Sequence, residues 1–260
     1  SPRAERSAVK RGLAIYAAAA YAFLHLPLAT LVVFSFNASR FTLWEGFSLR
    51  WYQSLFTDAE MAEAAWNSVI IAIASTVIST VAGTLTAYGL WKRGSRLLSG
   101  SLYLSLVTPE IVTGISLLAF FQWAFRWLGW HLGLYTVILA HVSFSIAYVA
   151  IVVAARLRTF DPALEEAAMD LGATEWRAFW RVTLPALTPG IVAAALLALT
   201  ISFDDYVITS LVAGVDSTTL PMVIYAMARR GANPSINAIS ALIVVIFGAL
   251  ILISERLREA

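Results

Sequence analysis

Apolar residues form long unbroken runs along this chain, and polar residues are concentrated between the runs. A hydrocarbon core of about 30 Å is crossed by roughly 20 helical residues, and each run reaches that length. Because the runs are continuous rather than alternating, they predict helices and not strands. The sequence therefore predicts an all-α integral membrane protein with six transmembrane helices in a single domain, residues 1–260. The expected spans are residues 13–36, 66–91, 101–125, 134–155, 187–211 and 236–254.

Composition and charge agree with this pattern and add an orientation. The chain is 60% hydrophobic and 13% charged, and its mean hydropathy is +0.77, which is outside the usual range of soluble domains. If the N-terminus is cytoplasmic, all but five of the 18 basic residues fall on the cytoplasmic side, and the positive-inside rule then predicts N-in and C-in. The exceptions are Arg40, Arg50, Arg126, Arg229 and Arg230. The net charge of +2 thus reflects topology and gives no reason to expect a nucleic-acid partner.

Cysteine and histidine usage limits the possible chemistry. The chain has no cysteine, which excludes disulfides, thiolate catalysis and cysteine zinc sites. His25 and His141 lie within expected spans without close ligand spacing, so we interpret them as hydrogen-bonding groups between packed helices, and no metal site is expected. The first apolar run is longer than the core of a signal peptide, so we expect it to be retained.

Three carboxylates interrupt the expected spans. Glu110 lies in the third span, and Asp204 and Asp205 are adjacent in the fifth. A charged aspartate at mid-bilayer costs about 2.5–3.5 kcal/mol on translocon scales, so these side chains should face a protected interior. A site lined by carboxylates attracts cations and rejects anions. The flanking Phe203 and Tyr206 can add about 0.5–2 kcal/mol per ammonium group through cation–π contact.

The local geometry separates the roles of these acids. Adjacent residues diverge by about 100° on a helix, so Asp204 and Asp205 cannot both face one pathway unless the helix is irregular there. One is expected to bind substrate while the other pairs with a neighbouring subunit or with backbone. Pro109 directly precedes Glu110 and is expected to kink the third span. The alternative is that the acids pair with arginines of a partner subunit and only hold a complex together.

Two segments between the spans have helical patterns of their own. In the first outer segment, Trp51, Leu55 and Phe56 are spaced as on a helix at the membrane surface, or they are simple interface anchors. In the inner segment 156–186, Asp161 and Pro162 predict a helix start, and Gly172 predicts its end. Thr174 can cap a second helix. In the first of these helices, we expect one face to be formed by Leu164, Ala167, Ala168 and Leu171, with Glu165, Glu166 and Asp170 pointing away from it. In the second helix, we expect a face at the bilayer boundary formed by Trp176, Phe179 and Trp180.

This inner segment resembles a known signature. Glu166-Ala167-Ala168, three residues, Gly172, nine residues, Val182, one residue and Leu184-Pro185 resemble the EAA motif of permease subunits in ABC importers, with Val182 where the family usually has isoleucine. Four further stretches are similar to the spermidine/putrescine branch of this family. They are FSLRWYQSLF followed by NSVIIA, TPEIVTGISLL at 108–118, SFDDYVITSLVAG at 202–214 and TLPMVIYAMARRGANPSINAIS at 219–240.

The resemblance implies a type I ABC importer permease fold in a bacterial inner membrane. It implies that residues 156–186 contain a coupling helix that docks into an ATPase, with Glu166, Ala167, Ala168, Gly172, Leu184 and Pro185 as the coupling residues. It also implies an ATPase dimer, a second permease subunit, an external solute-binding protein and contact with membrane lipid.

The sequence lacks a nucleotide-binding motif, which predicts that ATP is hydrolysed by another subunit. No G-x-x-x-x-G-K phosphate loop occurs in the sequence, so we expect ATP and Mg²⁺ to be bound by the partner and no cofactor by this chain. The leading hypothesis is a polyamine permease subunit, with another organic cation or small solute as the alternative cargo. An intramembrane enzyme using Asp204, Asp205 and Glu110 is a weaker alternative, because adjacent aspartates on a helix diverge rather than share a proton.

Overall fold

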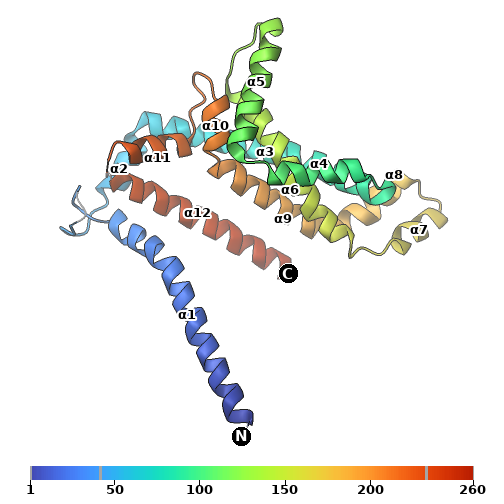
Figure 1. Cartoon of the computed structure of the whole chain (residues 1–260), viewed down its shortest axis with the longest axis horizontal. Helices are drawn as coiled ribbons and strands as arrows, with labels where there is room; N and C mark the ends of the chain where they lie inside the picture. Colours follow the sequence, from blue (N-terminus) through green and yellow to red (C-terminus); the bar gives the residue numbers. More distant parts are fainter. Residues whose placement is uncertain (1, 41–42, 232–233, 260) are drawn as a thin grey trace. The chain divides into compact units, whose positions relative to one another are not determined.

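The computed structural model describes residues 2–40, 43–231 and 234–259, with side chains described for 12–40, 43–231 and 234–250. Across these residues all regular secondary structure is helical, with no β-strand and only one isolated bridge, between Asn37 and Phe47. The predicted all-α class is therefore confirmed (Figure 1). The helices are α1 (Pro2–Ser35), α2 (Arg50–Thr57), α3 (Ala59–Arg93), α4 (Arg96–Val107), α5 (Glu110–Leu128), α6 (Leu134–Leu157), α7 (Ala163–Asp170), α8 (Glu175–Ala178), the π-helix η1 (Phe179–Thr183), α9 (Leu184–Asp204), α10 (Val207–Val212), α11 (Leu220–Arg229) and α12 (Pro234–Glu259).

Within the residues that the structure describes, five helical stretches are long and apolar enough to cross a membrane. These are Gly12–Ser35, Ala59–Arg93, Glu110–Leu128, Leu134–Leu157 and the continuous run Glu175–Asp204. The sixth expected span, 236–254, lies in α12, whose apolar stretch within the side-chain-described residues is Pro234–Leu250. The chain forms two compact units: unit 1 comprises residues 1–59 and 224–252, and unit 2 comprises residues 60–223 and 253–260.

Two of the expected spans are not continuous helices. The third, 101–125, is divided into α4 and α5, which point in clearly different directions in Figure 1. The fifth, 187–211, is divided into α9 and α10. In the first case a kink at Pro109 was expected, and the structure instead has a complete break. Both breaks lie in unit 2, and together they create the site described below.

Helix α6 is the centre of unit 2. It is apolar on all sides, which is typical of a buried helix, and more than half of its most apolar stretch is buried. One end packs with α3 and α9 through Val149, Val153 and Leu187, and the other packs with α5 and α10 through Phe144 and neighbouring side chains. The α3 backbone approaches α6 closely at Gly83, where an added Cβ would lie 2.7 Å from Val149.

Helix α2 of unit 1 is formed by the aromatic segment singled out in the sequence. Trp51 and Leu55 are buried, and the Trp51 Nε1–H donates to the carbonyl of Asn37 at 2.8 Å. Phe56 is 81% exposed. The predicted helix is therefore present, but its aromatic residues do not share one outward face, because Trp51 anchors the helix to the end of α1.

Candidate functional site

A cavity of about 620 Å³ opens where the two helix breaks of unit 2 meet. The chain turns out of helical geometry between α4 and α5 and again between α9 and α10, and both turns contribute to the cavity wall. Three lining residues are acidic and none is basic. The lining consists of Ser105, Leu106, Val107, Thr108, Pro109, Glu110, Thr113, Phe144, Tyr148, Thr200, Ile201, Asp204, Asp205, Tyr206, Val207 and Ile208.

The first break follows from Pro109. Proline has no N–H to donate and sterically disfavours helical geometry in the preceding residue. Thr108 accordingly has ψ 127° and Pro109 has ψ 137°, so two successive residues are extended. Helix α5 restarts at Glu110, which places this carboxylate at the N-terminal end of a helix, where the helix dipole favours negative charge. Glu110 is exposed and lines the cavity.

The second break contains no proline and is formed by Asp205. Its backbone is extended, with φ −66° and ψ 123°. Its carboxylate accepts hydrogen bonds from the Thr209 N–H and the Thr209 hydroxyl, each at 2.7 Å, and from the Ile208 N–H at 3.4 Å. These are the otherwise unpaired donors at the start of α10, so Asp205 caps that helix. Its side chain is only 6% exposed.

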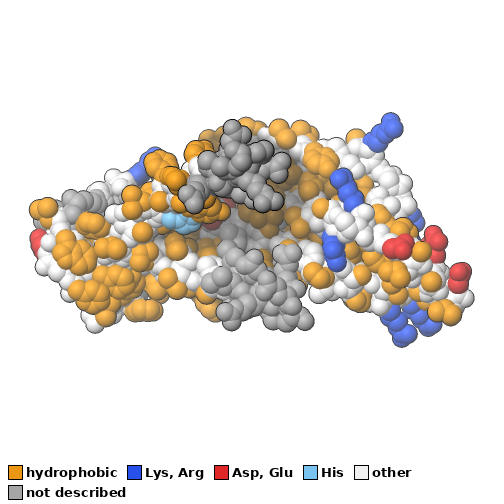
Figure 2. All heavy atoms as spheres, turned by 90° about the horizontal axis from the view of Figure 1, so that it is seen from below, with side chains coloured by type: hydrophobic (Ala, Val, Ile, Leu, Met, Phe, Trp, Pro, Cys, Tyr) orange, Lys and Arg blue, Asp and Glu red, His pale blue; other side chains and the backbone are white. Residues whose placement is uncertain are grey.

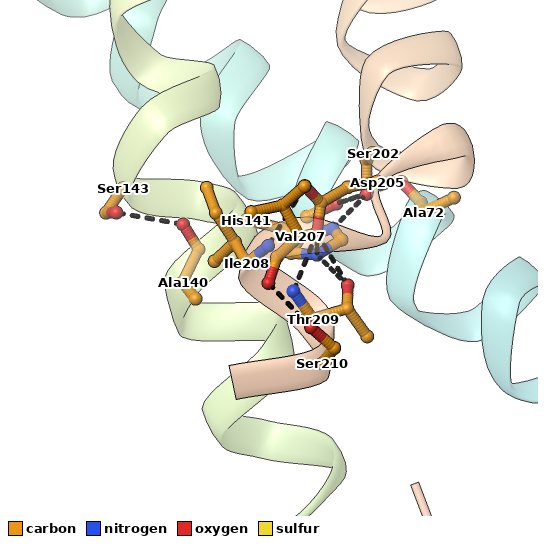
Figure 3. Close-up of polar contacts among 11 residues, drawn as sticks. Ala72, Ala140, His141, Ser143, Ser202, Asp205, Val207, Ile208, Thr209 and Ser210 are labelled. Carbon is orange, nitrogen blue, oxygen red and sulfur yellow. Dashed lines mark hydrogen bonds and ion pairs between the residues drawn. The ribbon is translucent and has the colours of Figure 1, made fainter. Parts of the chain in front are cut away.

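His141 fixes this arrangement from α6. As Figure 3 shows, the imidazole points toward Asp205 and lies between α9 and α10. Its Nδ1 lies 2.7 Å from the Ser202 hydroxyl, while its Nε2 lies 2.9 Å from the Thr209 hydroxyl and 3.4 Å from the Asp205 carboxylate. The Ser202 hydroxyl is also 2.8 Å from that of Ser75 on α3. The predicted packing role of His141 is therefore confirmed, within a buried polar cluster that joins four helices.

Asp204 has a different environment from its neighbour. It ends α9, is exposed and lines the cavity. Within the described part of the chain, neither Asp204 nor Glu110 has a hydrogen-bonding or ion-pairing partner for its side chain. The structure thus brings the three predicted acids to one cavity, two of them with unpaired carboxylates and one with its oxygens occupied by the protein.

The aromatic residues of the cavity differ in part from those expected. Tyr206 lines the cavity as predicted, whereas Phe203 is half-buried and is not among the lining residues. Phe144 and Tyr148 of α6 complete the wall. Sequence reasoning missed both, although a tyrosine in the middle of an apolar span was a usable signal for Tyr148.

At the other end of unit 2, the predicted pair of short helices is present as α7 and α8. The Asp161 carboxylate accepts from the Ala163 N–H at 3.0 Å, and the Thr174 hydroxyl accepts from the Arg177 N–H at 3.4 Å. Gly172 ends the first helix with φ +88°, a left-handed conformation that favours glycine. Most of the charged side chains visible in Figure 2 gather at this end.

The expected coupling residues do not lie on a single element. Glu166 and Ala167 are exposed on α7, Ala168 is half-buried, and Gly172 is exposed, with open space where a side chain would begin. Leu184 and Pro185 instead begin α9. The motif therefore spans a short helix and the start of the long helix that ends at Asp204. Exposed apolar side chains adjoin it, with Leu164 53% and Leu171 90% exposed.

Two expectations for this segment are wrong. Glu165 does not point away with Glu166, because its carboxylate is bonded inside unit 2 and the residue is 1% exposed. Phe179 does not share an outward face with Trp176 and Trp180, which are 61% and 51% exposed. It is 2% exposed, and its ring lies 4.6 Å from that of Tyr88. The π-helix η1 begins at this residue and changes the helical rotation there.

Comparison with known proteins identifies the class to which this fold and cavity belong. Residues 79–260 match the family described as the binding-protein-dependent transport system inner membrane component, and the chain belongs to this family. It is a multi-pass membrane permease subunit of an ABC importer and not itself an enzyme, so the assignment from the EAA motif is confirmed. The intramembrane enzyme alternative is thereby excluded.

Two of the relatives within this family are named for polyamine transport. The chain is 43% identical over 230 residues to the putrescine transport system permease protein PotI of Escherichia coli (strain K12), covering 86% of this chain and 82% of that protein. It is 39% identical over 243 residues to the spermidine/putrescine transport system permease protein PotC of Haemophilus influenzae, covering 92% and 93%.

Solved structures support the fold. A chain of a bacterial ABC transporter involved in the import of the acidic polysaccharide alginate matches with a TM-score of 0.76 at 18% identity, covering 96% of each chain. A chain of the MetNI methionine ABC transporter matches with a TM-score of 0.65 at 20% identity, covering 75% of this chain and 93% of that one. At these identities the likeness establishes the permease fold and carries no information about cargo.

Proposed function

We propose that this chain is a permease subunit of an ATP-driven polyamine importer and that the acidic cavity is part of its translocation pathway. The observation that carries the proposal is the cavity lining, in which every charged side chain is a carboxylate. Its volume of about 620 Å³ lies within the range of roughly 300–1,000 Å³ typical of small-molecule sites. The relatives named for putrescine and spermidine support a cargo of this charge.

Glu110 and Asp204 are the proposed cargo ligands. Both line the cavity with unpaired carboxylates contributed by different helix ends, so two separated ammonium groups of one flexible amine have two separate partners. Unpaired charge is expensive within a membrane and marks ion and substrate pathways. Tyr206 and Tyr148 supply aromatic faces in the same wall, each contributing about 0.5–2 kcal/mol to a desolvated ammonium group.

Asp205 has a supporting role in this proposal. Its oxygens are already bonded to the start of α10 and to His141, so it holds the break open and thereby directs Asp204 toward the cavity. Phe203 is absent from the lining, and we assign it no contact with cargo. This division follows the sequence-based expectation that one aspartate binds substrate while the other pairs with backbone.

The coupling function is proposed for α7 and the residues that follow it. The exposed Glu166, Ala167 and Leu171, with the left-handed turn at Gly172, form a projecting helix end suited to a partner's groove. An ATPase dimer that binds ATP and Mg²⁺ is the proposed occupant, and this chain needs no cofactor of its own. Closure of the ATPases would move α7 and rock the spans, so that the cavity is exposed first to one side and then to the other.

The proposed assembly contains this chain, a second permease subunit, the ATPase dimer and an external solute-binding protein. A structurally similar alginate ABC transporter supports such partners for the family, since it has been solved in complex with its periplasmic protein. Six spans with both termini in the cytoplasm, surrounding lipid and a bacterial inner-membrane location complete the proposal. The distribution of basic residues supports that orientation.

The proposal is tested by ATP-dependent uptake into proteoliposomes that contain the full complex, with a panel of mono-, di- and triamines. Glu110→Gln and Asp204→Asn are expected to raise the apparent KM for the preferred amine roughly tenfold or more, because a hydrogen bond to a charged group contributes about 1.5–3 kcal/mol. Glu63→Gln is the matched control, since Glu63 is an exposed acid of α3 that does not line the cavity.

Three outcomes of this experiment are informative. Preference for diamines and triamines that is lost in both cavity variants supports the proposal. Saturable uptake of a different organic cation or of a neutral solute, without uptake of amines, would show that the cargo is not a polyamine. The permease function would still hold. Failure of the two variants to assemble, with normal uptake in the fraction that does assemble, would show that the acids only hold the complex together.

A further inference from the structure

Glu165 is a buried carboxylate that the proposed pathway does not use. It belongs to α7, yet it is 1% exposed and makes contacts with two other elements. Its Oε1 accepts a hydrogen bond from the Tyr88 hydroxyl at 2.7 Å and lies 2.8 Å from the Lys92 ammonium. Its Oε2 accepts from the Thr183 hydroxyl at 3.2 Å. One carboxylate therefore joins the last turns of α3 to η1, the π-helix that leads into α9.

Aromatic side chains of α3 and η1 lie around the Glu165 contact. The Tyr88 ring packs against Phe179 at 4.6 Å, and the Lys92 ammonium lies 5.2 Å from the centre of the Trp91 ring. Burial raises the pKa of Glu165, but the hydrogen bonds and charge from Lys92 and the hydroxyl donors outweigh burial, so the pKa lies below its usual value. The carboxylate is therefore ionised at neutral pH, and removing one partner leaves an uncompensated buried charge.

The elements joined by Glu165 lead directly to the acidic cavity. Thr183 is the residue before α9, and α9 runs without interruption to Asp204. Helix α3 contains Ser75, which is hydrogen-bonded to Ser202 near the far end of α9. The π-helix η1, which lies between α8 and α9, is a rare, wide helical turn of a kind often found at functional sites. Two continuous helices thus connect the Glu165 contact with the cavity: α9 leads to Asp204 directly, and α3 leads to α9 through the Ser75–Ser202 hydrogen bond.

We propose that Glu165 is a positioning residue that clamps α7 to both α3 and α9, so that movement of the coupling helix is transmitted to the two helices together. Its two oxygens give separate arms: Oε1 holds α3 through Tyr88 and Lys92, and Oε2 holds the start of α9 through Thr183. This inference rests on the proposed function of α7 as the ATPase-docking helix. It adds to that function the internal connection through which docking acts.

The clamp is tested in the full complex by measuring amine uptake and ATP hydrolysis in the same proteoliposomes. Glu165→Gln, Lys92→Met and Thr183→Val are expected to lower the ratio of amine transported to ATP hydrolysed by roughly two- to thirtyfold, the range for mutations along coupling networks. Lys92→Arg should restore the ratio because it keeps the charge. Thr188→Val is the matched control for Thr183→Val, since Thr188 is exposed and bonds only within α9.

Docking is measured separately, so that the clamp and the proposed function can fail independently. The chain has no cysteine, and Asp170→Cys introduces one at the exposed last residue of α7, which is not among the proposed docking residues. Cross-linking of this cysteine to the ATPase in every clamp variant, together with a lowered uptake ratio, supports the clamp. Unchanged ratios with normal cross-linking would overturn the clamp alone.

Three further outcomes would each contradict the clamp. Loss of cross-linking in the Glu165→Gln complex would mean that Glu165 only shapes α7 for docking, and the clamp would be wrong. Absence of cross-linking in the otherwise unchanged Asp170→Cys complex, with uptake intact, would overturn the docking role of α7 and the clamp with it. A lowered ratio for Thr183→Val but not for a Tyr88→Phe/Lys92→Met double variant, which loses both α3 contacts of Glu165, would remove the α3 arm and contradict the two-arm clamp.

Discussion

Asp204 and Asp205 show how one residue step changes what a carboxylate does. Asp204 is the last residue of α9 and lines the cavity without a protein partner, whereas Asp205 caps α10 and contacts His141. Aspartate competes well for backbone N–H groups, which favours helix caps over helix interiors. The acid that ends the helix therefore keeps an unpaired carboxylate in the cavity, and the acid that follows it stabilises the break.

The two residues should differ sharply in their effect on stability. Asp205→Ala removes the cap of α10 and leaves His141 without one partner, so we expect the free energy of unfolding to fall by about 1–2 kcal/mol. Asp204→Ala should change it by less than about 0.5 kcal/mol, as for an exposed position without a partner. Thermal unfolding of the two purified proteins in detergent measures the difference. An equal effect of both changes would contradict the division of roles.

Sequence reasoning anticipated part of this geometry. Because acidic residues are rare within apolar runs, the sequence predicted that Glu110, Asp204 and Asp205 belong to one acidic site. All three line the cavity. The prediction left open which aspartate would pair with backbone, because that depends on contacts that local periodicity does not contain. His141 meets Ser202 and Thr209 across 61 and 68 residues of sequence, and Glu165 meets Tyr88 across 77. Such contacts follow from helix packing rather than from any local pattern.

At the scale of elements, the apolar runs located the long helices but not the breaks within them. Pro109 signalled the first break, and only its extent was underestimated. The second break has no proline or glycine, and Asp205 forms it through hydrogen bonds that an uninterrupted helix would not permit. The short helices α7 and α8 were predictable because Asp161, Thr174 and Gly172 carry local signals that need no tertiary contact.

Gly172 provides a test at this scale. Its φ of +88° is unfavourable for residues with a side chain, and such strain costs of order 1–3 kcal/mol. We expect Gly172→Leu to alter the end of α7 and to reduce ATP-dependent uptake at least tenfold while leaving membrane insertion unchanged, since a tenfold change needs only about 1.4 kcal/mol. Uptake in proteoliposomes and the amount of protein in the membrane fraction measure the two effects.

A matched variant separates backbone strain from side-chain bulk. Asparagine tolerates the left-handed region better than leucine, so Gly172→Asn should retain much more uptake. No atom of this chain lies within 4 Å of a Cβ placed at Gly172, and the chain itself therefore does not oppose a larger side chain. Equal loss in both variants would indicate that the partner surface, and not the backbone conformation, excludes side chains here. Full activity in Gly172→Leu would contradict the docking role.

At the scale of the whole molecule, acidic and basic residues are segregated for different reasons. The unpaired carboxylates of unit 2 lie at helix breaks within apolar elements, where only a protected cavity makes charge tolerable. Basic residues lie mostly at helix ends and in the segments around α7 and α8. We expect the first pattern to favour a cationic cargo and the second to orient the chain in the membrane. Both follow from the cost of placing charge in hydrocarbon.

The orientation can be measured directly because the chain contains no cysteine. Single cysteines are introduced at four strongly exposed positions: Leu97, Trp127, Leu171 and Val215. If both termini are cytoplasmic, a membrane-impermeant thiol reagent should label Trp127→Cys and Val215→Cys in intact spheroplasts. It should label Leu97→Cys and Leu171→Cys only after permeabilisation. The unmodified chain, which should remain unlabelled, is the control.

The pattern of labels also tests the number of crossings. Trp127 lies at the end of α5, Val215 follows α10, and Leu171 lies between α6 and α9. Labelling of Trp127→Cys and Val215→Cys from outside, with Leu171→Cys labelled only after permeabilisation, therefore requires that α6 and the α9–α10 pair each cross the membrane. If Trp127→Cys and Val215→Cys were labelled from opposite sides, one of these elements would not cross, and the six-span topology would be wrong. Complete reversal of the pattern would keep the crossings and place α7 outside the cell, away from any ATPase, which would exclude ATP-driven coupling through that helix.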